Sequence, residues 1–169
     1  MRILGIDPGT VSMGYGLVED GEELRALHWG VLSPGVSLPL EQRLHRLYVD
    51  LSAMIREWQP QEVAVEDPFV ARENRSVRTA LAIGQAQGVA LMAAASFGLP
   101  TFRYSPAQVK HAVADYGAST KEQVQEMVRL LLELSETPAP SDAADALALA
   151  ICHLHQRRLE SLLARETTR

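Results

Sequence analysis

The chain has 169 residues, of which 47% are hydrophobic and 22% charged, as expected for a globular domain with one core. Its single cysteine, Cys152, excludes an intrachain disulfide. The apolar runs are too short for a signal peptide or a membrane span, so a cytoplasmic location is expected. The net charge of −5 argues against nucleic-acid binding, unless the acids form a metal site and the basic residues gather on one face.

The first half of the chain predicts four strands and one helix. Residues 2–7, 12–19 and 24–32 form three strands, and the first of them is ended by Pro8 and Gly9. Apolar residues at helical spacing predict an amphipathic helix over 40–58, before Pro60. Residues 62–66 form the fourth strand, and the intervening helix implies a parallel crossover.

The second half predicts helices around one more strand. After a polar loop, a helix runs from about 76 to 96, and residues 100–104 form the fifth strand. Capping boxes at Ser105 and Ser119 open two helices, and Ser141 caps a last helix that runs into the 150s. The prediction is an α/β domain over 1–158, with a mixed five-stranded sheet flanked by helices, and a polar, flexible tail over 159–169.

Four carboxylates stand out by position. Asp7 and Glu66 end the first and fourth strands, at the sheet edge where open α/β sheets bind ligands. Asp142 and Asp145 are three residues apart, which places both on one helix face. Four clustered carboxylates repel one another unless cations neutralise them, and hard oxygen ligands select Mg²⁺ or Mn²⁺. Two such ions would balance the acids and clamp both sides of a phosphodiester displacement.

Each acid also has a simpler interpretation. Asp142 can favour its helix N-terminus through the dipole, Glu66 can be an exposed strand end, and Asp7 before Pro-Gly can be a turn acid. These alternatives stay open from patterning alone. Asp67 and Asp115 are interpreted as surface acids.

Several blocks in order resemble the RuvC family of Holliday junction resolvases over about residues 1–158. They are ILGIDPGT at 3–10 with GYG at 14–16, Val65-Glu66, GQAQG at 84–88, QVK at 108–110 and DAADALA at 142–148. The resemblance implies a ribonuclease H-like fold and a homodimeric, divalent-metal-dependent endonuclease. Such an enzyme makes paired nicks across a four-way DNA junction in homologous recombination and DNA repair. The resemblance also implies partnership with the RuvA–RuvB branch-migration complex.

The resemblance assigns the four acids to the reaction and the two lysines to DNA, whereas the arginines are expected to hold phosphates because they lie close to the aromatic Phe69. The family's catalytic acids map onto Asp7, Glu66, Asp142 and Asp145. The cofactor expected from their charge is two Mg²⁺ ions per site, with Mn²⁺ as a substitute. The expected DNA-binding residues are Phe69, Arg72, Arg75, Arg78, Lys110 and Lys121. Phe69 would wedge into the junction by stacking on a base, or it is a core residue under its loop. The lysines would contact phosphate, or they are solvated surface residues.

Small residues repeat every four positions at Ala80, Gly84 and Gly88. Such a stripe permits close helix packing, either on the sheet or against a second subunit. Because a symmetric substrate needs two equivalent sites, we favour a twofold interface. His111, beside Lys110, is expected to be a surface residue.

Two other functions compete with a junction nuclease. Actin-like and sugar-kinase-type ATPases also open with an Asp-x-Gly-Thr strand end, which the residues at 7–10 match. Those proteins need a second related domain, for which 169 residues leave no room, and they do not explain Asp142 and Asp145. A non-catalytic junction-binding module is the other candidate, and the four intact acids argue against it.

Overall fold

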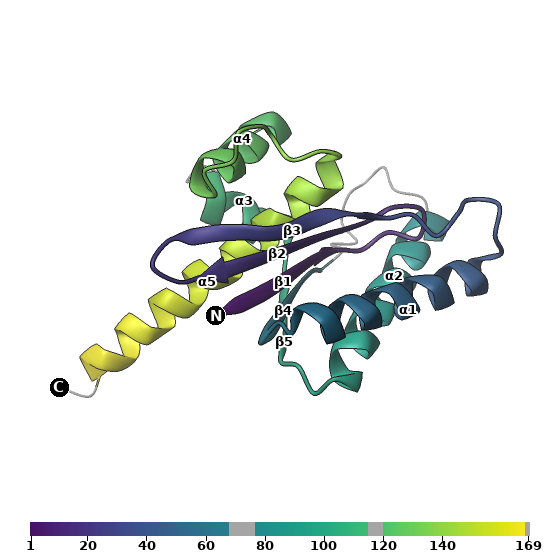
Figure 1. The fold of residues 1–169 in the computed structure, drawn as a ribbon, viewed down its shortest axis with the longest axis horizontal. Coiled ribbons are helices and arrows are strands. Elements are labelled where there is room, and N and C mark those ends of the chain that lie inside the picture. Colours follow the sequence, from purple (N-terminus) through teal and green to yellow (C-terminus); the bar gives the residue numbers. More distant parts are fainter. Residues whose placement is uncertain (68–76, 115–119, 168–169) are drawn as a thin grey trace.

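The computed structural model describes residues 1–67, 77–114 and 120–167. These residues form one sheet with helices on both of its faces (Figure 1). The strands are β1 (Arg2–Asp7), β2 (Met13–Asp20), β3 (Leu24–Leu32), β4 (Glu62–Glu66) and β5 (Thr101–Tyr104). The helices are α1 (Leu40–Trp58), α2 (Val77–Ser96), α3 (Pro106–Ala114), α4 (Lys121–Leu131) and α5 (Ser141–Thr167).

The strand order is β3-β2-β1-β4-β5. The first three strands form an antiparallel meander, and β4 and β5 are each parallel to their inner neighbour. The predicted mixed five-stranded sheet is therefore confirmed. Because Ile6 pairs with Val65, the next residues along the two strands, Asp7 and Glu66, lie beside each other at the same sheet edge.

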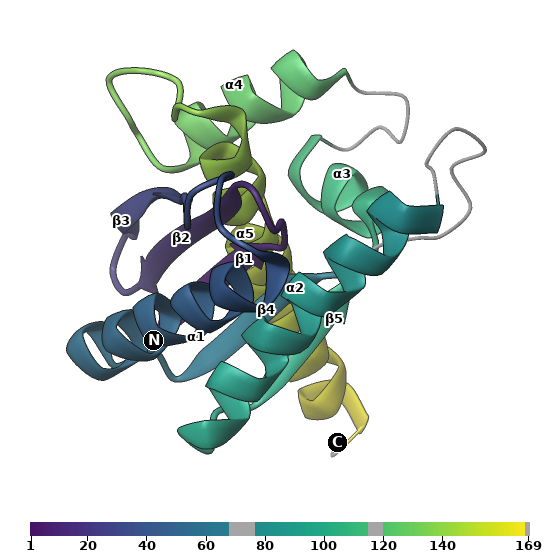
Figure 2. The ribbon, with the colours of Figure 1, turned by 90° about the vertical axis from the view of Figure 1, so that its right-hand side faces the viewer.

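Different helices cover the two faces of the sheet (Figure 2), and each face carries its own core. Leu4 and Ile6 of β1 pack in a cluster with residues of α1 and α2, whereas Ile3 packs in a cluster with residues of α3, α4 and α5. Side chains alternate along a strand, so Asp7 shares the face of Ile3. In β4, Ala64 lies on the α5 face and Val65 on the other, so Glu66 also faces α5.

Glycines let α5 lie very close to the sheet. A Cβ atom on Gly5 would lie 2.0 Å from the carbonyl oxygen of Ala146, and one on Gly14 would lie 2.0 Å from that of Asp142. On the helix side, Ala143 and Ala146 are fully buried. Any larger residue at these glycines would push the first turns of α5 away from the ends of β1 and β2.

The helix ends differ in detail from the prediction. The capping box at Ser105 and Gln108 is present, but the cap of α4 is Thr120, whose side chain accepts from the Gln123 amide, rather than Ser119. Ser141 is the first residue of α5, and this helix continues to Thr167 instead of ending in the 150s. The helix α5 thus extends into the predicted tail over 159–169. The flexibility of that tail stays a prediction.

No helix in the described ranges is both long and apolar enough to span a bilayer. The cytoplasmic location stays a prediction.

Candidate active site

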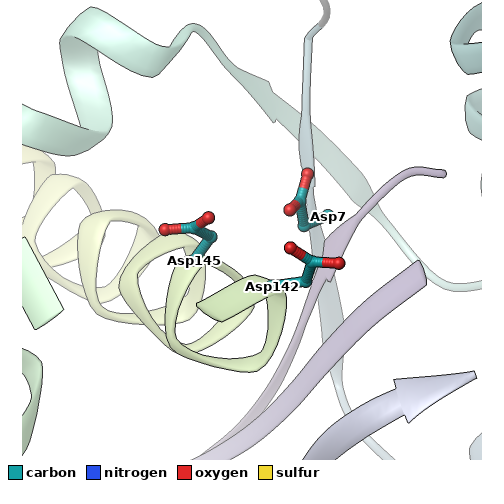
Figure 3. Close-up of side chains that lie close together, drawn as sticks. All are labelled: Asp7, Asp142 and Asp145. Atoms are coloured by element: carbon teal, nitrogen blue, oxygen red, sulfur yellow. The ribbon is translucent and has the colours of Figure 1, made fainter. Parts of the chain in front are cut away.

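Three aspartates from two distant segments of the chain converge at the carboxyl end of β1 (Figure 3). Each of Asp7, Asp142 and Asp145 offers a carboxylate oxygen, and these oxygens all lie within 4.8 Å of one another. Asp7 is the last residue of β1, and the other two stand one turn apart at the start of α5. The helical spacing of three therefore places both side chains toward the end of β1, as the sequence predicts.

The acids line a cavity of 810 Å³ between the sheet edge, α3, α4 and α5. Glu66 lines this cavity with the three aspartates, and so do Lys110 and Lys121. The cavity has room for a phosphodiester together with cations. The structure thus brings together all four predicted acids and both predicted lysines.

The electrostatics of Asp7 reflect this crowding. The pKa of Asp7 is raised from 3.8 to about 8, first by burial and then by the nearby carboxylates of Glu66, Asp145 and Asp142, while Lys121 opposes the shift. A carboxyl group that holds its proton near neutral pH marks a site with too little positive charge for its acids. A bound cation would supply that charge.

Two side chains hold the acids of α5 in place. The Ser12 hydroxyl donates a 2.6 Å hydrogen bond to Oδ2 of Asp142, and Nζ of Lys121 lies 2.7 Å from Oδ2 of Asp145. Burial lowers the pKa of Lys121, but its hydrogen bond with Asp145 and the charges of the neighbouring acids raise it overall. Lys121 therefore stays an ammonium group inside the site.

The end of β4 is fixed by a residue to which sequence reasoning gave no role. Nε2 of Gln87, from the buried side of α2, donates to the carbonyl oxygen of Glu66 at 3.2 Å and to Oδ1 of Asp67 at 3.1 Å. The backbone amide of Asp67 donates to the carbonyl of Tyr104. Asp67, interpreted from the sequence as a surface acid, is half-buried and hydrogen-bonded in the structure. The GQAQG block contained the only sequence signal for Gln87.

The hydroxyl of Ser12 was also missed. The clue in the sequence was a serine between the strand that ends in Asp7 and the Gly14-Tyr15-Gly16 block. That serine is distant in sequence from Asp142, and a hydrogen bond across 130 residues has no local pattern.

The remaining predicted DNA contacts fall in different places. Phe69, Arg72 and Arg75 lie outside the described residues, as does Asp115. Arg78 is exposed in the first turn of α2. His111 is exposed on α3, as predicted.

The small-residue stripe of α2 does not pack on the sheet. A Cβ atom at Gly84 or Gly88 would meet nothing within 4 Å, and both glycines are exposed. Leu81 and Met92 on the same helix are 64% and 52% exposed. This leaves a partly apolar outer surface on α2.

Comparison with known proteins decides the family. The family model described as crossover junction endodeoxyribonuclease RuvC matches residues 3–153. The chain belongs to the RuvC family. RuvC of Dehalococcoides mccartyi is 52% identical over 165 residues, covering 97% of each chain. RuvC of Thermomicrobium roseum is 51% identical over 162 residues, covering 96% of this chain and 98% of its own.

The comparison of folds leads to the same family as the comparison of sequences. RuvC of Thermus thermophilus, solved in complex with a Holliday junction substrate, superimposes with a TM-score of 0.87 at 38% identity, covering 95% of this chain and 96% of that one. The predicted ribonuclease H-like fold and Holliday junction resolvase activity are confirmed. The protein is a hydrolase of the RuvC type, and an ATPase of the actin or sugar-kinase type is not supported. RuvC nucleases depend on metal, and the acidic cluster described above can bind it.

Proposed function

We propose that the chain resolves four-way DNA junctions by paired, symmetric hydrolytic nicks, in homologous recombination and DNA repair, with Asp7, Glu66, Asp142 and Asp145 as its catalytic acids. The observation that carries the proposal is the convergence of three aspartate oxygens within 4.8 Å, in a cavity that also contains Glu66 and both lysines. Segments more than 130 residues apart are brought together there, although isolated carboxylates would repel one another.

The donor set fits two Mg²⁺ ions, with Mn²⁺ as a substitute. Among the described residues the cluster offers carboxylate oxygens and no thiol or imidazole, which is the ligand chemistry of hard divalent cations. The raised pKa of Asp7 indicates the missing positive charge. When bound, such ions supply charge to both the attacking and the leaving oxygen of the phosphodiester.

The chain's own residues perform the positioning. Asp7 and Glu66 are held on adjacent parallel strands, and Ser12 orients Asp142. Lys110, on the cavity wall, is placed to neutralise a backbone phosphate. In this proposal the phosphates give position and affinity, while the acids serve the chemistry.

A homodimer follows from the symmetry of the substrate. Two nicks related by a twofold axis need two sites related in the same way. The open glycines and exposed apolar side chains of α2 support this helix as part of the twofold interface. Partnership with the RuvA–RuvB complex rests on family membership.

The test replaces each acid by its amide. Asp7→Asn, Glu66→Gln, Asp142→Asn and Asp145→Asn should each slow junction cleavage in Mg²⁺ by at least about 10²-fold, from loss of electrostatic stabilisation. Junction binding without metal should persist, because phosphate contacts are untouched. Arg25→Gln, at an exposed β3 residue paired with Glu23, is the control and should cleave normally.

The outcomes separate the competing functions. Near-normal cleavage by any one amide variant would remove that residue from the proposed site. Junction binding without cleavage by the wild-type chain in either Mg²⁺ or Mn²⁺ would favour a non-catalytic junction-binding module.

A further inference from the structure

The chain uses lysine very selectively. Its sequence contains 16 lysines and arginines together, and only Lys110 and Lys121 are lysines. Both of them line the active-site cavity. A lysine is a compact charge on a flexible stem, whereas an arginine presents a planar fork that can grip a carboxylate with two bonds. The choice of lysine therefore suits a contact that must be exchanged.

Lys121 makes such a contact with one of the acids. Its Nζ lies 2.7 Å from Oδ2 of Asp145, and the lysine side chain is 50% exposed, against 25% for the aspartate. Asp145 belongs to the group of three aspartates whose oxygens can hold a cation. The ammonium group and a divalent ion thus compete for the same carboxylate, and their like charges repel at this distance.

The ammonium group can leave without disturbing the fold. The start of α4 is fixed by the reciprocal bonds between Thr120 and Gln123, and Val124 and Val128 bury its inner face. Lys121 sits on that fixed first turn with a half-exposed side chain, and exposed ion pairs contribute little to stability. A phosphate entering the cavity offers the ammonium an alternative partner.

We propose that Lys121 is an exchangeable counter-ion that couples DNA binding to metal binding. In the free protein it neutralises Asp145 and holds metal affinity down. When DNA enters, the ammonium group transfers to a phosphate and Asp145 becomes available to the ion. Linkage makes the effect reciprocal, so bound metal also favours the DNA-bound position of Lys121. The inference rests on the proposed function, in which these acids bind the metal.

The first experiment titrates Mn²⁺ into the full chain without DNA and follows free Mn²⁺ by electron paramagnetic resonance. Lys121→Met should bind Mn²⁺ at least about fivefold more tightly than wild type, because the competing charge is gone. Lys121→Arg should bind it more weakly than wild type, since a guanidinium can hold both oxygens of Asp145. Lys110→Met removes the same charge from the same cavity but leaves the ammonium group that contacts Asp145 in place, so it should change the affinity by less than about twofold.

The second experiment repeats the titration with a saturating plain DNA duplex, which offers phosphate without a junction to cut. Wild type should gain more Mn²⁺ affinity from the duplex than Lys121→Met does, because only wild type has a counter-ion to release. The difference between the two gains measures the coupling. Circular dichroism and the unfolding midpoint check each variant, and Lys121→Gln replaces Lys121→Met if the latter misfolds.

Two results would overturn the inference. Unchanged Mn²⁺ affinity in both Lys121 variants would make Lys121 a DNA contact alone. If Lys110→Met raised the Mn²⁺ affinity as much as Lys121→Met, the effect would come from the overall charge of the cavity and not from the contact with Asp145. Failure of the proposed function looks different: wild type would bind no Mn²⁺, or Asp7→Asn and Asp142→Asn would bind it as tightly as wild type.

Discussion

The hydroxyl of Ser12 donates a 2.6 Å hydrogen bond to Oδ2 of Asp142, which ties the loop after β1 to the first turn of α5. These residues are 130 positions apart. The other carboxylate oxygen of Asp142, Oδ1, accepts a 3.4 Å hydrogen bond from the hydroxyl of Ser141. Ser12 is therefore a positioning residue for one of the four acids, and it restricts the rotation of that carboxylate before any ion binds.

Ser12→Ala should weaken Mn²⁺ binding and slow junction cleavage by up to about tenfold, since a hydrogen bond to a charged group contributes about 1.5–3 kcal/mol and this one is partly exposed. Ser12→Thr keeps the hydroxyl and should restore both properties. The measurements are Mn²⁺ affinity and the single-turnover cleavage rate. Equal affinities in all three proteins would show that Asp142 is held by other contacts.

Gly14→Ala should harm both stability and the metal site. Its Cβ atom would lie 2.0 Å from the Asp142 carbonyl oxygen, so α5 must shift, at a cost of about 1–3 kcal/mol for overpacking. Gly21→Ala, in the exposed turn between β2 and β3, is the matched control. A Cβ atom there would meet only the carbonyl oxygen of Glu23, at 3.9 Å, so this variant should stay within roughly 0.5 kcal/mol of wild type and bind Mn²⁺ normally. Denaturant unfolding and Mn²⁺ titration measure the two effects, and equal stabilities for both variants would contradict this account of the close packing.

The raised pKa of Asp7 predicts a pH dependence of metal-free stability. Between 3.8 and about 8, Asp7 is ionised in the unfolded chain but protonated in the fold, so the fold binds the extra proton. The stabilisation is complete below pH 3.8 and is lost as pH rises toward 8. The contribution of Asp7 to the free energy of unfolding should therefore fall with a slope of up to about 1.4 kcal/mol per pH unit.

Asp7→Asn isolates this contribution. The free energy of unfolding of wild type and of Asp7→Asn is measured in EDTA from pH 5 to 9. The wild-type value minus the variant value should fall as pH rises toward 8, roughly the window set by linkage. Saturating Mg²⁺ should flatten the difference, because a bound cation lowers the pKa of Asp7. A pH-independent difference in EDTA would mean that Asp7 is ionised throughout.

His153 anchors α5 to the sheet at the end remote from the acids. It is fully buried, with Nδ1 2.6 Å from the Tyr104 hydroxyl and Nε2 2.5 Å from Oε2 of Glu62. His153→Phe should lower the free energy of unfolding by about 1–3 kcal/mol for each partner left without its hydrogen bond. Tyr104→Phe removes a single bond and should cost less. Chemical denaturation gives both values. If His153→Phe left the free energy of unfolding unchanged, the ion pair with Arg157, 3.3 Å away, would be enough to hold the Glu62 carboxylate.

Salt titrations of DNA affinity should separate phosphate contacts from the junction wedge. Lys110→Ala and Lys121→Ala should weaken binding to junction and plain duplex alike, and each should reduce the slope of log affinity against log salt by about 0.9. Phe69→Ala should leave the slope unchanged and cost roughly 1–3 kcal/mol, mainly on the junction, where bases are accessible for stacking. A lower unfolding midpoint with equal losses on both substrates would make Phe69 a core residue.

The sequence by itself determined most of the elements and which acids to expect together at one sheet edge. Alternation in the strands and helical spacing in residues 40–58 are local properties, so β1, β4 and α1 could be predicted with their observed bounds. The spacing of Asp142 and Asp145 fixed their common helix face before any tertiary contact was known. Residue types at strand ends also sufficed to predict oxygen ligands for a hard cation.

Only the tertiary structure decided how those acids are held. The contacts of Ser12 with Asp142 and of Lys121 with Asp145, like the bond of Gln87 to the end of β4, join segments that no periodicity relates. The same is true of Gly14, whose missing side chain matters because the backbone of α5 passes over it. Local sequence patterns specify which face a side chain takes, but the packing of α5 on β1 and β2 specifies which atoms it meets.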